Sequence, residues 1–95
     1  DLNETPYSID SNTTIDSVFP LSNELLYKYS IKEKVEDVSI DYFKSEQSKN
    51  LINNYCTTPD LEIFRNLGVM MSHTYYDING KFIAEFKIDN LKCLP

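Results

Sequence analysis

The sequence predicts an α+β domain of two layers, in which helices pack on one side of a four-stranded antiparallel sheet. Three observations support this fold class: two alternating β-branched or aromatic segments early in the chain, a helical pattern in the middle, and a hairpin pattern near the end. The predicted order is therefore strand, strand, helix, helix, strand, strand. Because 95 residues build a single core, we expect an irregular lead-in over residues 1–12 and one domain over residues 13–95.

The first two strands are predicted over residues 13–19 and 25–31. The first segment is rich in β-branched side chains, and in the second Tyr27 and Tyr29 share a face with Ile31. Pro20 and the polar residues after it separate the two segments by a length that is ordinary for a hairpin. We expect the two strands to pair antiparallel.

A helical segment is predicted after residue 39, because Phe43, Gln47 and Leu51 recur at four-residue steps. Residues 58–60, Thr-Pro-Asp, then supply an N-cap, a proline at the first helical position and an acid at the positive end of a second helix. Gly68 provides the glycine that ends this helix.

The strongest hairpin pattern joins residues 69–76 to residues 81–89. Two registers are open. If Asn79 and Gly80 form a two-residue type I′ loop, His73 pairs with Phe86 on the core face. If a type I turn is followed by Gly80 as the left-handed residue of a bulge, His73 pairs with Glu85. We favour the second register, because it keeps the charged side chains together on one face.

Cys56 and Cys93 are the only cysteines in the chain. They form no Cys-x-x-Cys motif, and a single histidine cannot complete a zinc site, so their spacing favours a structural disulfide. Two buried free thiols are the main alternative. A disulfide across this loop would contribute about 4 kcal/mol in the chain-entropy model.

The predicted location is the periplasm or the outside of the cell. The chain begins at Asp1 and contains no apolar run as long as those of signal peptides or membrane spans, so we expect a signal peptide to have been removed. The cysteine pair also favours an oxidising compartment.

The charge balance excludes two classes of partner. With 9 basic and 15 acidic side chains, the chain carries a formal charge of -6. This excess of acid argues against nucleic-acid binding by phosphate neutralisation and against a polybasic membrane-surface module. It favours a basic protein partner.

His73 is the only histidine and the one side chain expected to titrate near neutral pH. Beside Glu85 and Tyr75 it has the partners of a general base, but there is no nucleophile motif, second histidine or glycine-rich loop. We therefore predict that the chain is not an enzyme and needs neither a cofactor nor a metal. A small-ligand binder or hydrolase-like enzyme centred on His73 is the alternative.

The seven tyrosines suggest a surface for a partner. Packing within the sheet accounts for most of them, but Tyr27, Tyr29 and Tyr75, with His73 and Glu85, are candidates for an aromatic surface of the kind enriched at protein interfaces. The predicted function is thus a non-enzymatic protein-interaction domain. A virulence-associated protein, an inhibitor or an immunity protein would be its concrete form.

Several segments carry a family resemblance. They are residues 9–10 (Ile-Asp), 14–18 (Thr-Ile-Asp-Ser-Val), 26–31 (Leu-Tyr-Lys-Tyr-Ser-Ile), 56–61 (Cys-Thr-Thr-Pro-Asp-Leu), Gly68, 75–77 (Tyr-Tyr-Asp), 79–81 (Asn-Gly-Lys) and Cys93. The pattern resembles a group of small exported bacterial proteins that includes the quorum-sensing-regulated virulence factor family. The resemblance implies a compact α/β domain with one disulfide between the helical segment and the last strand, and it carries no catalytic motif.

Overall fold

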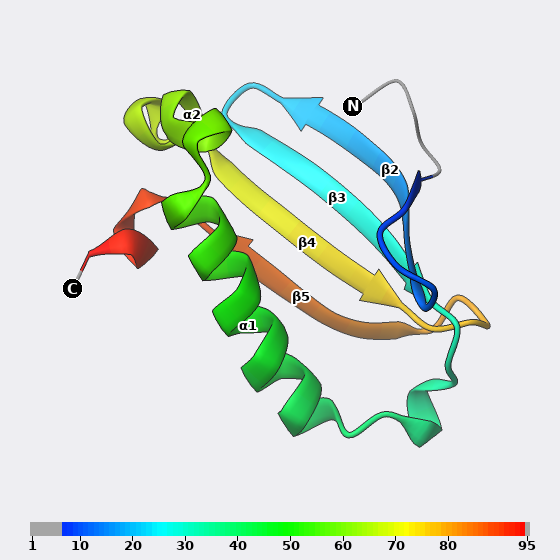
Figure 1. Cartoon of the computed structure of the whole chain (residues 1–95). Coiled ribbons are helices and arrows are strands. Elements are labelled where there is room, and N and C mark those ends of the chain that lie inside the picture. The colour runs from blue at the N-terminus through cyan, green and yellow to red at the C-terminus, as the bar shows by residue number, and fades with distance from the viewer. Residues whose placement is uncertain (1–6, 95) are drawn as a thin grey trace.

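The computed structural model describes residues 7–94 and shows an α+β fold with a five-stranded sheet (Figure 1). The elements are β1 (Tyr7–Ser8), β2 (Thr13–Leu21), β3 (Glu24–Ile31), α1 (Ile40–Thr57), α2 (Glu62–Leu67), β4 (Met70–Tyr76) and β5 (Phe82–Ile88), with short 3-10 turns at Val35–Asp37, Pro59–Leu61 and Asn90–Cys93. The predicted succession of strands and helices is present, and β1 precedes it. Residues 1–6 of the predicted lead-in lie outside the described part of the chain.

The sheet is mixed, so the prediction of a four-stranded antiparallel sheet was wrong in two respects. First, β1 adds a strand, because Tyr7 pairs with Ile15 of β2. Second, β3 and β4 are adjacent and parallel, whereas the other neighbouring strands are antiparallel.

The parallel pair follows from the length of α1. Its 18 residues rise about 27 Å, which matches the roughly 26 Å of the eight-residue strand β3. Figure 1 shows α1 running back along the sheet, so β4 starts at the same end as β3 and takes the same direction. A connection through a helix is the usual way to join parallel strands.

The β4–β5 hairpin differs from the favoured register. His73 pairs with Phe86, and Glu85 pairs with Thr74, so the predicted pairing of His73 with Glu85 was wrong. The turn itself has Gly80 at φ 80°, as that register required. A register shift between Tyr75 and Tyr76 then moves the remaining pairs by one residue. His73 therefore lies on the core face, and Glu85 lies on the opposite face.

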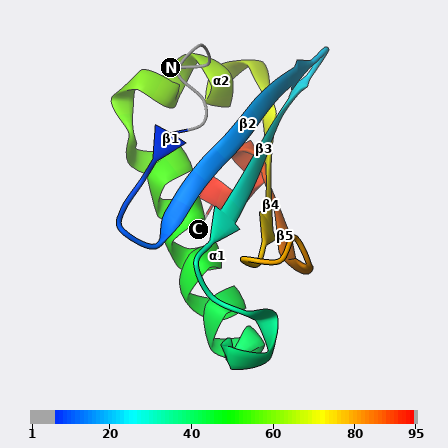
Figure 2. The same cartoon turned by 90° about the vertical axis from the view of Figure 1, so that its right-hand side faces the viewer.

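The core lies between the sheet and α1. Figure 2 shows α1 and β1 on the same side of the sheet, and no helix or strand within residues 7–94 lies against the other face. The buried apolar side chains come mainly from the three strands β3, β4 and β5, and α1 adds Tyr55, whose hydroxyl donates to the carbonyl of Val69 at 2.8 Å. The disulfide between Cys56 and Cys93 is confirmed, and it joins the last turn of α1 to the segment after β5.

Asp77 fixes the loop before α1 to the β4–β5 turn. Its buried carboxylate accepts hydrogen bonds from the backbone N–H groups of Val35, Asn79 and Lys81, each at 2.8 Å. Desolvation alone would raise the pKa of Asp77, but these backbone bonds outweigh it and hold the pKa below its ordinary value. The Asp77 carboxylate thus links the loop before α1 to the β4–β5 turn through hydrogen bonds.

We predict that Asp77→Asn lowers the free energy of unfolding at pH 7, because the amide turns a donor toward N–H groups that need an acceptor. A carboxyl with a depressed pKa stabilises the fold above its unfolded pKa, near 3.9, and that contribution is lost as the pH falls through the folded pKa. Urea unfolding at pH 7 and at pH 2 measures both effects. The exposed Asp60→Asn is the matched control, and an equal loss for Asp77→Asn at both pH values would contradict the assignment.

Candidate functional site

Four aromatic side chains lie on the face of β3 and β4 that is turned toward α1. Tyr27 and Tyr29 come from β3, and His73 and Tyr75 come from β4. The parallel register places Tyr27 beside His73, with ring centroids 5.0 Å apart, and Tyr29 beside Tyr75, with ring centroids 4.3 Å apart. Both pairs are stacked, so the rings form a continuous aromatic floor.

This floor contains four of the five residues proposed for a partner surface. Tyr29, Tyr75 and His73 are only 4%, 3% and 7% exposed, and Tyr27 is half-buried. They therefore line a recess instead of forming an exposed patch. The structure separates Glu85 from them, because it lies on the opposite face, where it accepts a long hydrogen bond from Thr74 at 3.4 Å.

His73 is neutral in this setting. Burial lowers the pKa of His73 from 6.5 to about 4, because the imidazolium form loses its hydration. The hydroxyl oxygen of Tyr29 lies 2.6 Å from His73 Nδ1, so the two side chains share a hydrogen bond. Burial also raises the pKa of Tyr29 and of Tyr75, and both phenols keep their protons. The aromatic floor is consequently uncharged at pH 7.

A cavity of about 380 Å³ opens above this floor. Leu51 and the amide side chains of Asn50 and Asn54 form its wall on α1, and Ile9 and Ile15 form the opposite wall. It is mostly apolar, with a few polar groups at its rim, as is common for binding sites.

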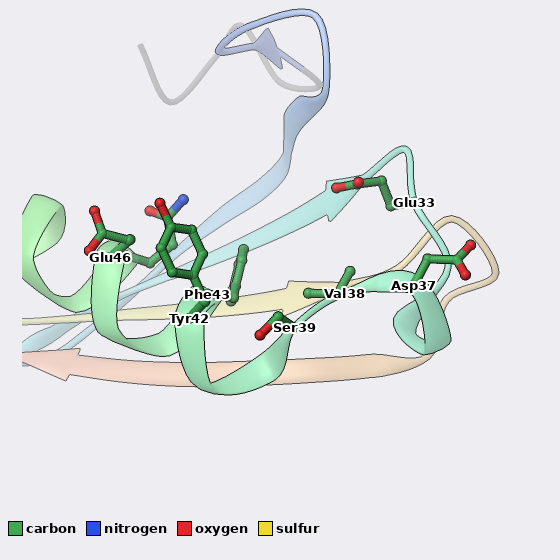
Figure 3. A pocket seen from close by; sticks show the side chains of 8 residues that line it. Glu33, Asp37, Val38, Ser39, Tyr42, Phe43 and Glu46 are labelled. Atoms are coloured by element: carbon green, nitrogen blue, oxygen red, sulfur yellow. The ribbon is translucent and has the colours of Figure 1, made fainter.

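A second cavity of about 320 Å³ lies at the start of α1 (Figure 3). Val38 and Phe43 are among its apolar lining residues, and three carboxylates, those of Glu33, Asp37 and Glu46, belong to its lining as well. Gln47 lines both cavities, and the lining residues of α1 follow one another on successive helical turns. We call the two cavities together the α1 groove. The lining residues near α1 extend from Ser39 to Asn54, over which a helix rises about 22 Å.

The sequence indicated the aromatic residues of the floor as candidates for a partner surface, but it did not indicate the groove. The four-residue spacing of Phe43, Gln47 and Leu51 predicted the helix, but it did not show that this stripe forms a wall of the groove. The amides of Asn50 and Asn54 gave no signal, because polar residues beside an apolar stripe are typical of any half-exposed helix.

Comparisons with known proteins show the fold. No family model and no curated protein matches the chain. Among solved structures, the pilotin EpsS of the Vibrio vulnificus type 2 secretion system has a TM-score of 0.80 and 13% identity, over 99% of this chain and 82% of that chain. A candidate secreted protein of Pseudomonas aeruginosa has a TM-score of 0.78 and 14% identity, over 98% and 82%. The type II secretion pilotin AspS of Vibrio cholerae has a TM-score of 0.68 and 11% identity, over 96% and 80%.

These identities are low, so the likeness establishes a shared architecture while function has to be argued from the groove. The resemblance to the quorum-sensing-regulated virulence factor family stays a prediction. Within residues 7–94, no helix is both long and apolar enough to cross a bilayer.

We predict that the fold loses about 3 kcal/mol of stability between pH 6.5 and pH 4. In that window the unfolded chain binds a proton at His73 and the folded chain does not, so stability rises with pH. Urea unfolding across this range should show the slope in the wild type and in Tyr29→Phe, but His73→Phe should flatten it. A histidine that titrates above pH 6 in the NMR spectrum of the folded chain would refute this.

Proposed function

We propose that the chain is an exported, non-enzymatic protein-interaction domain that holds a segment of a partner protein in the α1 groove. The observation that carries this proposal is the α1 groove, which follows a stretch of helix about 22 Å long and has an uncharged aromatic floor and an amide rim in one of its two cavities. A helix of about 15 residues or a shorter extended segment matches this length. Apolar grooves of this shape commonly receive the apolar face of an amphipathic helix.

The fold comparisons and the disulfide support export. The similar structures are pilotins of type 2 secretion systems and a candidate secreted protein, and the Cys56–Cys93 bond suits an oxidising compartment. By analogy with these pilotins, the partner is a component of a secretion system. The inhibitor and immunity roles have less support, because they required an exposed aromatic surface, and most of the proposed rings are buried. The virulence role depends on the family resemblance alone.

A catalytic role for His73 has weak support. A base whose conjugate acid has a pKa of about 4 is a poor proton acceptor at neutral pH. Its cross-strand neighbour is Phe86, and Tyr29 occupies Nδ1. His73 does lie in the floor of the cavity, which favours a second candidate function, the binding of an apolar small molecule.

Site-specific photo-crosslinking tests the proposal. A photoreactive phenylalanine at Asn50 or Asn54, both exposed on the groove wall, should give an adduct of defined protein mass in the native envelope. The same probe at Lys28 or Lys87, both exposed on the opposite face, is the matched control and should give none.

Adducts from the opposite face alone would overturn the groove as the site of the partner. Groove positions without any protein adduct would also overturn it. In that case, an apolar small molecule that stays bound to the purified wild type, and that does not bind to the Leu51→Arg variant, would establish the second candidate function.

A further inference from the structure

The two ends of the α1 groove differ in charge. Among residues 7–94, the lining of the cavity above the aromatic floor contains no ionised side chain, because His73 is neutral. Its rim carries the amides of Gln47, Asn50 and Asn54. Of the described residues, those that line the cavity at the start of α1 include three carboxylates and no basic side chain. A bound segment therefore meets a neutral end and an acidic end.

The local ion pairs only partly offset the acidic end. Glu46 pairs with Lys49 at 3.5 Å, on the surface of α1. Glu33 accepts a hydrogen bond from the neutral amide of Asn12 at 3.1 Å, and no cation among residues 7–94 forms an ion pair with Glu33 or Asp37. The excess of negative charge at this end remains available to a partner, and it has the same sign as the charge of -6 on the whole chain.

Apolar and aromatic side chains line the same cavity as these carboxylates. Figure 3 shows the Glu33 side chain on the loop after β3, and Tyr42 and Phe43 projecting from α1. In the same view the Asp37 and Glu46 carboxylates point outward at opposite ends of the cavity. Tyr42 is 68% exposed, so its ring is accessible. Lysine and arginine suit such a site, because their aliphatic stems pack on apolar surface while the charged head meets carboxylates or an aromatic ring.

We propose that the segment held in the α1 groove is an amphipathic helix whose end over residues 39–42 carries lysine or arginine, while the end over Asn54 is uncharged. This inference rests on the proposed function and adds the chemistry and the orientation of the partner segment. The apolar stripe of the helix contacts the aromatic floor, and the basic end meets Glu33, Asp37 and Glu46.

Three fluorescent stapled helices of about 15 residues test this charge pattern. Each carries the same apolar stripe, with a pair of arginines at one end, the same pair in the centre, or a pair of glutamates at one end. Fluorescence anisotropy with the full chain measures the dissociation constants. We expect the helix with terminal arginines to bind about tenfold more tightly than either of the others, and to weaken as salt is raised.

A matched pair of protein variants locates the effect. Glu33→Gln/Asp37→Asn/Glu46→Gln should weaken the helix with terminal arginines about tenfold and remove its advantage. The control, which removes three exposed carboxylates elsewhere, is Asp60→Asn/Glu62→Gln/Glu85→Gln. It changes the net charge equally and should alter the affinity less than about twofold.

Equal affinity for all three helices, or equal weakening by both triple variants, would overturn the basic-ended helix and leave the groove proposal standing. No binding of the helix with terminal arginines would also overturn this inference. The photo-crosslinks at Asn50 and Asn54 report separately on the groove, so a failure of the proposed function is recognised by their absence.

Discussion

The parallel pairing of β3 with β4 is the constraint on which the groove depends. It places Tyr27 beside His73 and Tyr29 beside Tyr75, which makes a single aromatic floor out of residues that are more than 40 positions apart in the sequence. The same connection that makes the strands parallel brings α1 along the sheet as the wall of the groove. An antiparallel arrangement of these strands would give a different set of neighbours and a different floor.

The two ends of this wall are held by different kinds of bond. Cys56, in the last turn of α1, is covalently joined to Cys93 beyond β5, and the loop before α1 is tied to the β4–β5 turn through Val35 and Asp77. Lys81 adds an ion pair with Glu36 at 3.1 Å in the same region. A groove whose wall is fixed at both ends needs little reorganisation when it binds, which lowers the entropic cost of holding a partner.

Local sequence signals predicted the local structure well. The end of the second helix at Gly68, the turn at Gly80 and the disulfide could all be predicted from the sequence. Each depends on residues close together in the chain or on a single chemical property. The parallel pairing of β3 with β4 was not predicted, because it depends on which strands become neighbours in the sheet, and local patterns do not specify this. The register shift between Tyr75 and Tyr76 has no sequence signature. Because the predicted hairpin lacked this shift, it paired His73 with Glu85 instead of Phe86 and placed His73 on the wrong face.

The recess between α1 and the aromatic floor is the surface through which we propose that this domain binds its partner. The most direct test is a ¹H–¹⁵N correlation spectrum of the full chain, labelled with ¹⁵N, recorded with and without the basic-ended helical peptide. We predict that the side-chain amide signals of Gln47, Asn50 and Asn54 shift, and that backbone signals of the opposite face, such as those of Lys28 and Thr74, do not. Shifts confined to the opposite face, or no shifts at a saturating concentration, would contradict it.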